Sequence, residues 1–153
     1  MVSKSYLCLL WMIVFHFSVV SAQGIDPVEW KFTSKKLDSQ TYEVRISAEM
    51  EYPWRIYSQH TEEGGPIPTA IEFRENPAVE LKGETKEEGS LIEKYEEVFM
   101  VDARYYMGIV DFVQQVKVEK KTAQALEGSV TFMACTDEQC LTPQQVEFNV
   151  RLN

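Results

Sequence analysis

The chain has 153 residues and a formal net charge of −9, a length typical of one domain. Hydrophobic residues make up 44% of it and charged residues 25%, which is the composition of a globular protein and excludes disorder of the whole chain. The excess of acid argues against nucleic-acid binding, which needs a basic face to neutralise phosphates, and against binding to anionic membrane surfaces.

The first 22 residues are predicted to be a secretory signal peptide. Lys4 gives the N-terminal region a positive charge, and a nearly all apolar run covers residues 6–17. Val20-Ser21-Ala22 has the small side chains of a cleavage site. The apolar run is short for a bilayer core of about 30 Å, which argues against a membrane anchor. We expect cleavage after Ala22, export to an oxidising compartment, and a mature domain over residues 23–153 without a transmembrane segment.

The mature chain is predicted to consist of short β-strands. Residues 41–50 alternate apolar and polar side chains, which is the period of a half-buried strand, and several later segments repeat this period. In chain order, the candidate strands are residues 28–33, 41–50, 54–58, 69–73, 103–106, 109–118, 129–135 and 145–152.

Turn-forming residues separate most of these segments, among them Gly64-Gly65-Pro66, Asn76-Pro77, Lys82-Gly83 and Glu88-Gly89. Regular short strands divided by turns predict an all-β chain that folds as an immunoglobulin-like β-sandwich. Residues 91–99 break the pattern, because their apolar side chains have helical spacing. We interpret this segment as a loop with at most one helical turn.

Two cysteines remain after cleavage, Cys135 and Cys140, separated by four residues between two predicted strands. In an exported protein such a pair most often forms a structural disulfide. However, a ring of about six residues removes little entropy from the unfolded chain, so the bond would stabilise less than most disulfides. A bond in a tight, exposed loop is also more readily reduced. A structural disulfide and a redox-active one therefore both remain open.

Metal and protease chemistry are not predicted for this cysteine pair. Zinc would need two further soft or imidazole ligands, and His60 is the one histidine of the mature chain. A cysteine protease needs a free thiol with a histidine partner, whereas here the two neighbouring cysteines would be oxidised together to a disulfide in the oxidising compartment. We predict no metal and no cofactor, and we interpret His60 as an exposed loop residue.

Three motifs accompany the signal peptide and the predicted strands. In the first motif the cysteines flank an acidic loop, and Pro143 follows shortly after Cys140. The second motif is Trp-Arg-Ile-Tyr-Ser-Gln at 54–59, which precedes Gly-Pro-Ile-Pro-Thr at 65–69. The third is Tyr-Glu-Glu-Val-Phe at 95–99, which precedes a predicted strand. In this ordered set the chain resembles the N-terminal periplasmic domain of the thiol:disulfide interchange protein DsbD. The resemblance covers residues 27–152 and implies a standalone form of that domain located in the periplasm.

The resemblance also implies roles for individual residues. In the family the two cysteines cycle between dithiol and disulfide; here Cys140 would form mixed disulfides and Cys135 would resolve them. The family carries an aromatic cap over the pair. By position this cap is Phe99, with Tyr95 as the second choice, and Tyr57 matches an aromatic residue beside the cysteines.

Asp137 and Glu138 lie between the cysteines. They are expected to disfavour thiolate by like-charge repulsion, so that the pair would need a docked partner, although ordinary solvation of the loop explains them equally well.

The resemblance implies a function in electron relay. In the family, electrons arrive by way of a thioredoxin-like domain and pass to periplasmic thiol-disulfide proteins. The sequence contains no C-x-x-C, so we expect a separate thioredoxin-like donor. The predicted function is a thiol-disulfide exchange module, and the alternative is a secreted immunoglobulin-like binding module with a structural disulfide.

Overall fold

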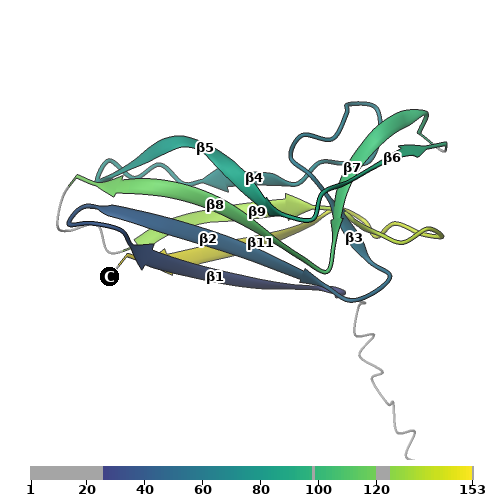
Figure 1. Cartoon of the computed structure of the whole chain (residues 1–153). Coiled ribbons are helices and arrows are strands. Elements are labelled where there is room, and N and C mark those ends of the chain that lie inside the picture. The colour runs from purple at the N-terminus through teal and green to yellow at the C-terminus, as the bar shows by residue number, and fades with distance from the viewer. Residues whose placement is uncertain (1–25, 98, 120–124, 153) are drawn as a thin grey trace, which may run out of the picture.

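The computed structural model describes residues 26–97, 99–119 and 125–152, and every helix or strand assigned within these ranges is a strand. The strands form three antiparallel sheets, of order β1-β2-β8-β5, β11-β9-β4 and β10-β3-β7-β6 (Figure 1). Their bounds are β1 Val28–Lys36, β2 Thr41–Met50, β3 Arg55–Tyr57, β4 Ala70–Phe73, β5 Val79–Gly89, β6 Ile92–Glu96, β7 Val101–Met107, β8 Ile109–Val118, β9 Ala125–Phe132, β10 Ala134–Cys135 and β11 Gln144–Arg151.

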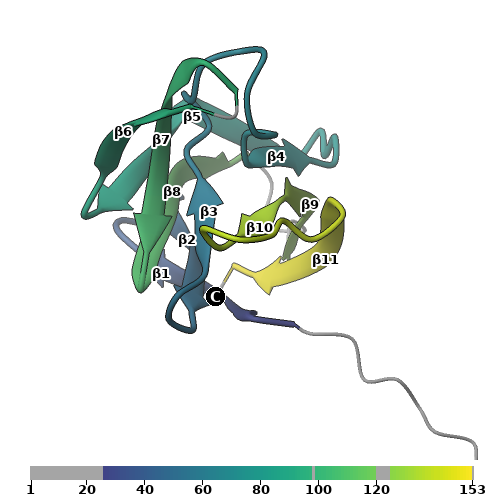
Figure 2. The same ribbon diagram turned by 90° about the vertical axis from the view of Figure 1, so that its right-hand side faces the viewer.

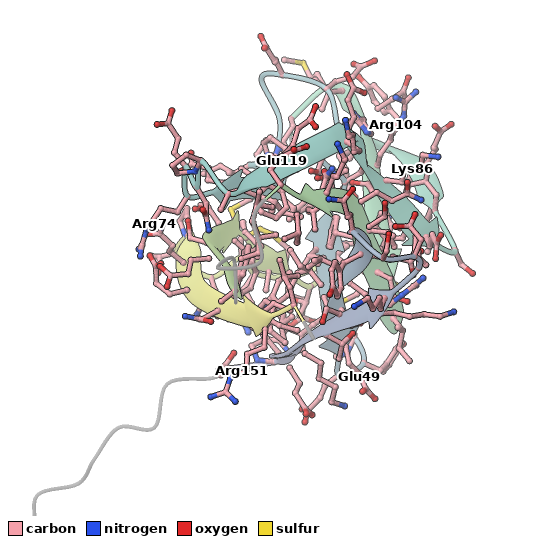
Figure 3. All side chains as sticks on the ribbon, turned by 90° about the vertical axis from the view of Figure 1, so that its left-hand side faces the viewer. Glu49, Arg74, Lys86, Arg104, Glu119 and Arg151 are labelled. Atoms are coloured by element: carbon pink, nitrogen blue, oxygen red, sulfur yellow. A yellow bond between two sulfur atoms is a disulfide. The ribbon has the colours of Figure 1, made fainter. Side chains whose placement is uncertain are left out.

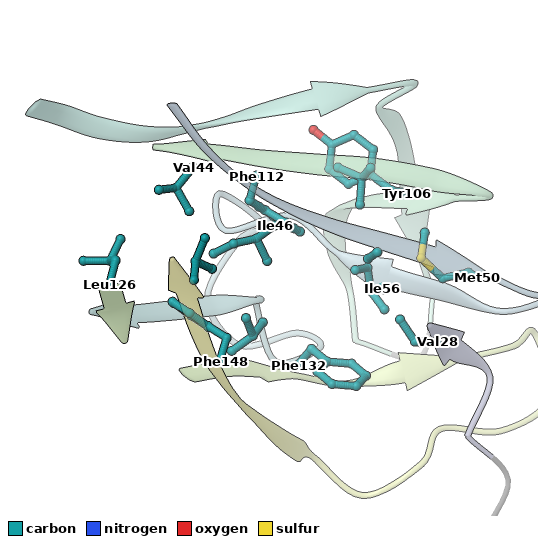
Figure 4. Packing of buried hydrophobic residues seen from close by; sticks show 14 of the residues in the cluster. Val28, Val44, Ile46, Met50, Ile56, Tyr106, Phe112, Leu126, Phe132 and Phe148 are labelled. Atoms are coloured by element: carbon teal, nitrogen blue, oxygen red, sulfur yellow. The ribbon is translucent and has the colours of Figure 1, made fainter. Parts of the chain in front are cut away.

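The first two sheets face each other as the layers of a sandwich, and the main core lies between them. Alternate residues of β2 and β8, such as Ile46 and Phe112, are fully buried there, as are Val130 and Phe132 of β9 on the opposite layer (Figure 4). Charged side chains such as Arg74 point away from this core (Figure 3). The predicted all-β, immunoglobulin-like sandwich is therefore confirmed.

The third sheet lies at one end of the sandwich, where the chain leaves the two layers (Figure 2). Strand β9 continues into β10 after Met133, β5 continues into β6 after two residues, and β7 runs into β8 through Gly108. Gly108 has a φ of 74°, a conformation that side-chain-bearing residues rarely adopt and that permits the abrupt change of direction. Three strands of the end sheet, β6, β7 and β10, thus follow or precede sandwich strands through connections of one or two residues.

The alternating segments were predicted well. Strands β2 and β8 have the predicted bounds, and the shorter segments all contain strands, although their ends differ by a few residues. The predicted strand over residues 129–135 is divided at Met133 into the end of β9 and the two-residue β10. The division leaves the alternation intact, because Met133 and Cys135 still face away from the main core.

Two expectations about the middle of the chain were wrong. Residues 92–96 form β6, not a loop, because they pair with β7 from Ile92 opposite Tyr105 to Glu96 opposite Val101. Strand β5 was missed because Lys82-Gly83 resembles a break between strands. The strand instead shifts its register between Lys82 and Lys86, and the side-chain amide of buried Gln114 donates to the carbonyl oxygen of Lys82 at 3.2 Å.

The predicted signal peptide, residues 1–22, lies outside the described residues. In the part of the chain that the structure does describe, no helix has the length and apolar character needed to cross a bilayer.

Candidate functional site

One face of the end sheet carries the disulfide, and we call it the disulfide face. Along β3 the side chains alternate, so that Ile56 enters the main core while Arg55 and Tyr57 lie on the opposite face. The register of β10 and β3 sets Cys135 opposite Arg55. A second buried cluster forms on this face from Tyr57, Ala103, Tyr105, Met133 and Cys135.

Cys135 and Cys140 form a disulfide whose Cα atoms are 4.0 Å apart in an antiparallel bridge. The loop between them is a tight turn held by Thr136. Its hydroxyl oxygen accepts the backbone N–H groups of Glu138 and Gln139, both at 3.1 Å, and its own N–H donates to the carbonyl oxygen of Gln139 at 2.7 Å. A polar four-residue loop therefore places the two sulfur atoms within bonding distance.

The two cysteines differ sharply in exposure. Cys135 is 0% exposed, because it belongs to the end sheet and to the second buried cluster. Cys140 is exposed, because it follows the loop and lies outside the strands. A partner protein can therefore approach Cys140 more easily than Cys135.

A cavity of about 170 Å³ lies beside Cys140. It is lined by Arg55, Tyr57, Glu96, Phe99, Thr136, Asp137, Glu138, Gln139 and Cys140. The fold thus brings together most of the side chains that the sequence singled out, from β3, from the turn after β6 and from the cysteine loop. Tyr95 does not line the cavity and is 55% exposed, and His60 is exposed, as the sequence indicated.

Phe99 belongs to the turn between β6 and β7. The backbone N–H groups of Phe99 and Met100 both donate to the carbonyl oxygen of Glu96, at 3.1 and 2.8 Å, which closes the turn. Gly65 lies against this turn, and a Cβ atom at that position would be 2.6 Å from Cγ2 of Val101. A side chain at position 65 would therefore displace Val101, the first residue of β7, next to the turn that carries Phe99.

We predict that Phe99→Ala makes the reduced cysteine pair react several-fold faster with a small alkylating agent. The reason is that Phe99 and Cys140 line the same cavity, so loss of the ring opens access to the thiol. The measurement is the alkylation rate of the reduced protein under native conditions. Equal rates in variant and parent, with unchanged circular dichroism, would assign Phe99 a packing role alone.

The sequence analysis did not single out four residues that line the cavity, Glu96, Thr136, Gln139 and Arg55, and of these Arg55 is the one cation. Only 6% of it is exposed, and its Nη2 donates to the carbonyl oxygen of Thr136 at 2.9 Å and to Oδ1 of Asp137 at 2.7 Å. Its guanidinium also lies 4.8 Å from the centroid of the Tyr105 ring. The available signal was a charged residue within the apolar segment 54–57, inside the strand predicted over residues 54–58.

The pairing with Arg55 changes the expectation for Asp137. The hydrogen bond and the positive charge of Arg55 lower the pKa of Asp137. The ion pair is therefore fully formed at every pH above the usual aspartate pKa, and it is lost only as the pH falls through the lowered pKa. Burial is the largest single influence on Arg55 and lowers its pKa, but the hydrogen bond to Asp137 together with the electrostatic interactions with Tyr57, Asp137 and Glu96 outweighs it, and the pKa of Arg55 is raised. Asp137 is therefore half of an ion pair and not an isolated negative charge between the cysteines.

The other ionisable groups of the cavity are acids and one phenol. Burial raises the pKa of Tyr57, so its hydroxyl is neutral at physiological pH. Within the described residues, no group of three or more His, Cys, Asp or Glu side chains is arranged to hold a metal ion.

The fold and the site together define an immunoglobulin-like sandwich domain with a disulfide at one end. Solved structures of the same fold include the N-terminal periplasmic domain of ScsB from Proteus mirabilis, with a TM-score of 0.54 and 15% identity over 80% of this chain and 44% of that chain. This chain therefore spans less than half of that ScsB structure.

The N-terminal domain of DsbD from Neisseria meningitidis, in its reduced form, also matches with a TM-score of 0.54, at 14% identity over 83% of this chain and 86% of that chain. No family model and no curated protein sequence matches the chain. The resemblance to the DsbD N-terminal domain is thus confirmed at the level of the fold.

Proposed function

We propose that residues 23–153 form a periplasmic module for thiol-disulfide exchange, released by removal of residues 1–22. In this proposal the Cys135–Cys140 pair relays reducing equivalents from a thioredoxin-like donor to periplasmic acceptor proteins. The observation that carries the proposal is the asymmetry of the disulfide, in which an exposed Cys140 beside a lined cavity is bonded to a buried Cys135. One sulfur atom is accessible to attack while the fold retains the other.

The exchange proceeds in two displacement steps. A donor thiolate attacks Sγ of Cys140, a mixed disulfide forms, and Sγ of Cys135 leaves as a thiolate that then takes up a proton. The second thiolate of the donor attacks the donor sulfur of the mixed disulfide and releases Cys140 as a thiolate. The donor becomes a disulfide and two electrons have passed to the pair, and the reverse sequence passes them to an acceptor.

We predict that a thioredoxin-like donor reduces the Cys135–Cys140 bond completely without unfolding the domain. A ring of about six residues contributes little stability, so the reduced fold persists on its core. Alkylation followed by mass spectrometry counts the free thiols, and circular dichroism reports the fold. A bond that only denaturant makes reducible would contradict the proposed function, as would two free thiols after export.

The second candidate is an immunoglobulin-like binding module in which the disulfide is structural. The complete burial of Cys135 in a packed cluster favours it, since structural cysteines are typically buried and inert. The reduction potential separates the two functions. A value well below about −300 mV marks a structural bond, and a higher value supports exchange.

A further inference from the structure

We propose that Arg55 is the counter-ion of the Cys135 thiolate and thereby controls how readily Cys135 leaves and later resolves a mixed disulfide. This inference rests on the proposed exchange function, and it assigns Arg55 as a positioning residue of the redox pair. It follows from the burial of Cys135, from the register of β10 and β3, and from the hydrogen bonds of the guanidinium.

Cys135 is the sulfur on which negative charge develops, and it is shielded from solvent. Attack on the exposed Cys140 expels Cys135 as a thiolate, and Cys135 is 0% exposed. Its neighbours in the buried cluster are aromatic or apolar, namely Tyr57, Ala103, Tyr105 and Met133. Burial in such surroundings raises the pKa of a thiol, and a thiol of higher pKa leaves more slowly. A buried positive charge beside Cys135 would remove this barrier.

Arg55 lies in the position to supply that charge. It is directly opposite Cys135 in the β10–β3 ladder, where facing residues have Cβ atoms about 4.5–5.5 Å apart and side chains on the same face. It is 6% exposed, so its charge is poorly screened by solvent. It also lines the cavity beside Cys140, and it is the one cation among the described residues that line it.

The guanidinium has donor capacity left for a thiolate. Of its five N–H donors, the described hydrogen bonds use those of Nη2, which reach Thr136 and Asp137. Nε of Arg55 is buried and has no hydrogen-bond partner within the described residues. Nη1 lies 4.0 Å from Oε1 of Glu96, which is too far for a hydrogen bond. Nε and Nη1 therefore make no described hydrogen bond and remain able to donate to a thiolate.

Apart from the exposed Lys94 of β6, the remaining groups that face the site oppose a thiolate or are neutral. Glu96 from β6 and the loop residues Asp137 and Glu138 are acidic. Tyr57 from β3 and Tyr105 from β7 are phenols, and Lys94 of β6 acts on Asp137 from the solvent side. Removal of Arg55 would therefore leave Cys135 among acids and phenols, and its thiolate would become less stable.

The test is the titration of Cys135 in a Cys140→Ser background, followed by the ultraviolet absorbance of the thiolate. Arg55→Gln is expected to raise the Cys135 pKa by about one unit, a tenfold loss of thiolate at a given pH below the pKa, whereas Arg55→Lys retains most of the parent value. Arg45→Gln is the matched control, because Arg45 is also multiply ion-paired but lies on β2, outside the disulfide face. It should leave the pKa unchanged.

Equal pKa values for Arg55→Gln and the parent would overturn the inference, and so would an equal shift in the Arg45→Gln control. The titration needs no partner protein, so its outcome is independent of whether a thioredoxin-like donor reduces the bond. A shifted pKa without reduction by a donor would refute the proposed function alone. A donor that reduces the bond in a protein with an unshifted pKa would refute the role of Arg55 alone.

A second pair of variants serves if Arg55→Gln does not fold. Asp137→Asn releases the guanidinium from its ion pair, whereas Glu138→Gln removes a nearby charge that makes no bond to Arg55 in the described structure. If Arg55 is the counter-ion, Asp137→Asn lowers the Cys135 pKa more than Glu138→Gln does. Equal shifts would mean that the loop acids act on the sulfur directly, which contradicts the inference.

Discussion

Cys135→Ser is expected to trap a thioredoxin-like partner as a covalent mixed disulfide through Cys140, whereas Cys140→Ser should trap almost none. The two thiols are chemically identical, but Cys140 is exposed beside the cavity and Cys135 is 0% exposed within the end sheet. An attacking thiolate must approach a sulfur in line with the bond that it breaks, and this approach is open at Cys140. The expected difference between the two variants is close to all-or-none.

The assay is a non-reducing gel of each variant mixed with a thioredoxin-like protein that lacks its resolving cysteine and whose remaining cysteine is activated as a mixed disulfide with thionitrobenzoate, which leaves as the covalent adduct forms. Circular dichroism of both variants controls for the fold, which the loss of so short a disulfide ring should leave intact. A stronger adduct from Cys140→Ser would reverse the assignment of the two roles. The absence of an adduct from either variant would favour the structural disulfide.

Phe112→Ala is expected to lower the free energy of unfolding by about 3–5 kcal/mol, the usual cost of removing a fully buried phenylalanine ring. Phe112 is 0% exposed at the centre of β8, and its ring centroid lies 6.3 Å from that of Trp30 in the main core. Unfolding by urea with the disulfide intact measures this loss. The alkylation rate of the reduced, folded variant should stay that of the parent, since Phe112 does not line the cavity.

Phe99→Ala is the matched control for this experiment, since it removes the same ring from the turn between β6 and β7. Phe99 is only partly buried and lies outside the described core clusters, so its loss should cost much less stability. Phe112→Ala should therefore change mainly the free energy of unfolding, and Phe99→Ala mainly the alkylation rate. A loss from Phe99→Ala as large as that from Phe112→Ala would place Phe99 in the structural core and contradict its role as a cap.

The candidate site could be predicted in part because some of its determinants are local. The short spacing of Cys135 and Cys140 indicated that they could bond, and the alternation up to residue 135 indicated that Cys135 belongs to a strand. Local spacing and alternation could not decide which of Phe99 and Tyr95 lines the cavity. It depends on the end of β6, because Tyr95 lies within the strand, whereas Phe99 lies in the turn that reaches the cavity.

The role of Asp137 depended on a contact between distant segments. As a neighbour of two cysteines it indicated either repulsion of a thiolate or ordinary solvation of the loop, whereas in the structure its carboxylate lies 2.7 Å from Nη2 of Arg55. The two residues are 82 positions apart in the chain, so no local pattern could join them. The pairing of β10 with β3 brings them together.

The sequence by itself determined the strands that have one buried and one exposed face, since burial on one side of a strand requires apolar residues at every second position. Strands β2 and β8 follow this rule and were predicted at their observed bounds. Tertiary structure alone decided β5 and β6, whose residues are mostly exposed and carry no such period. These are edge strands that form because β8 and β7 offer backbone hydrogen bonds to them, and the same long-range pairing places Arg55 opposite Cys135.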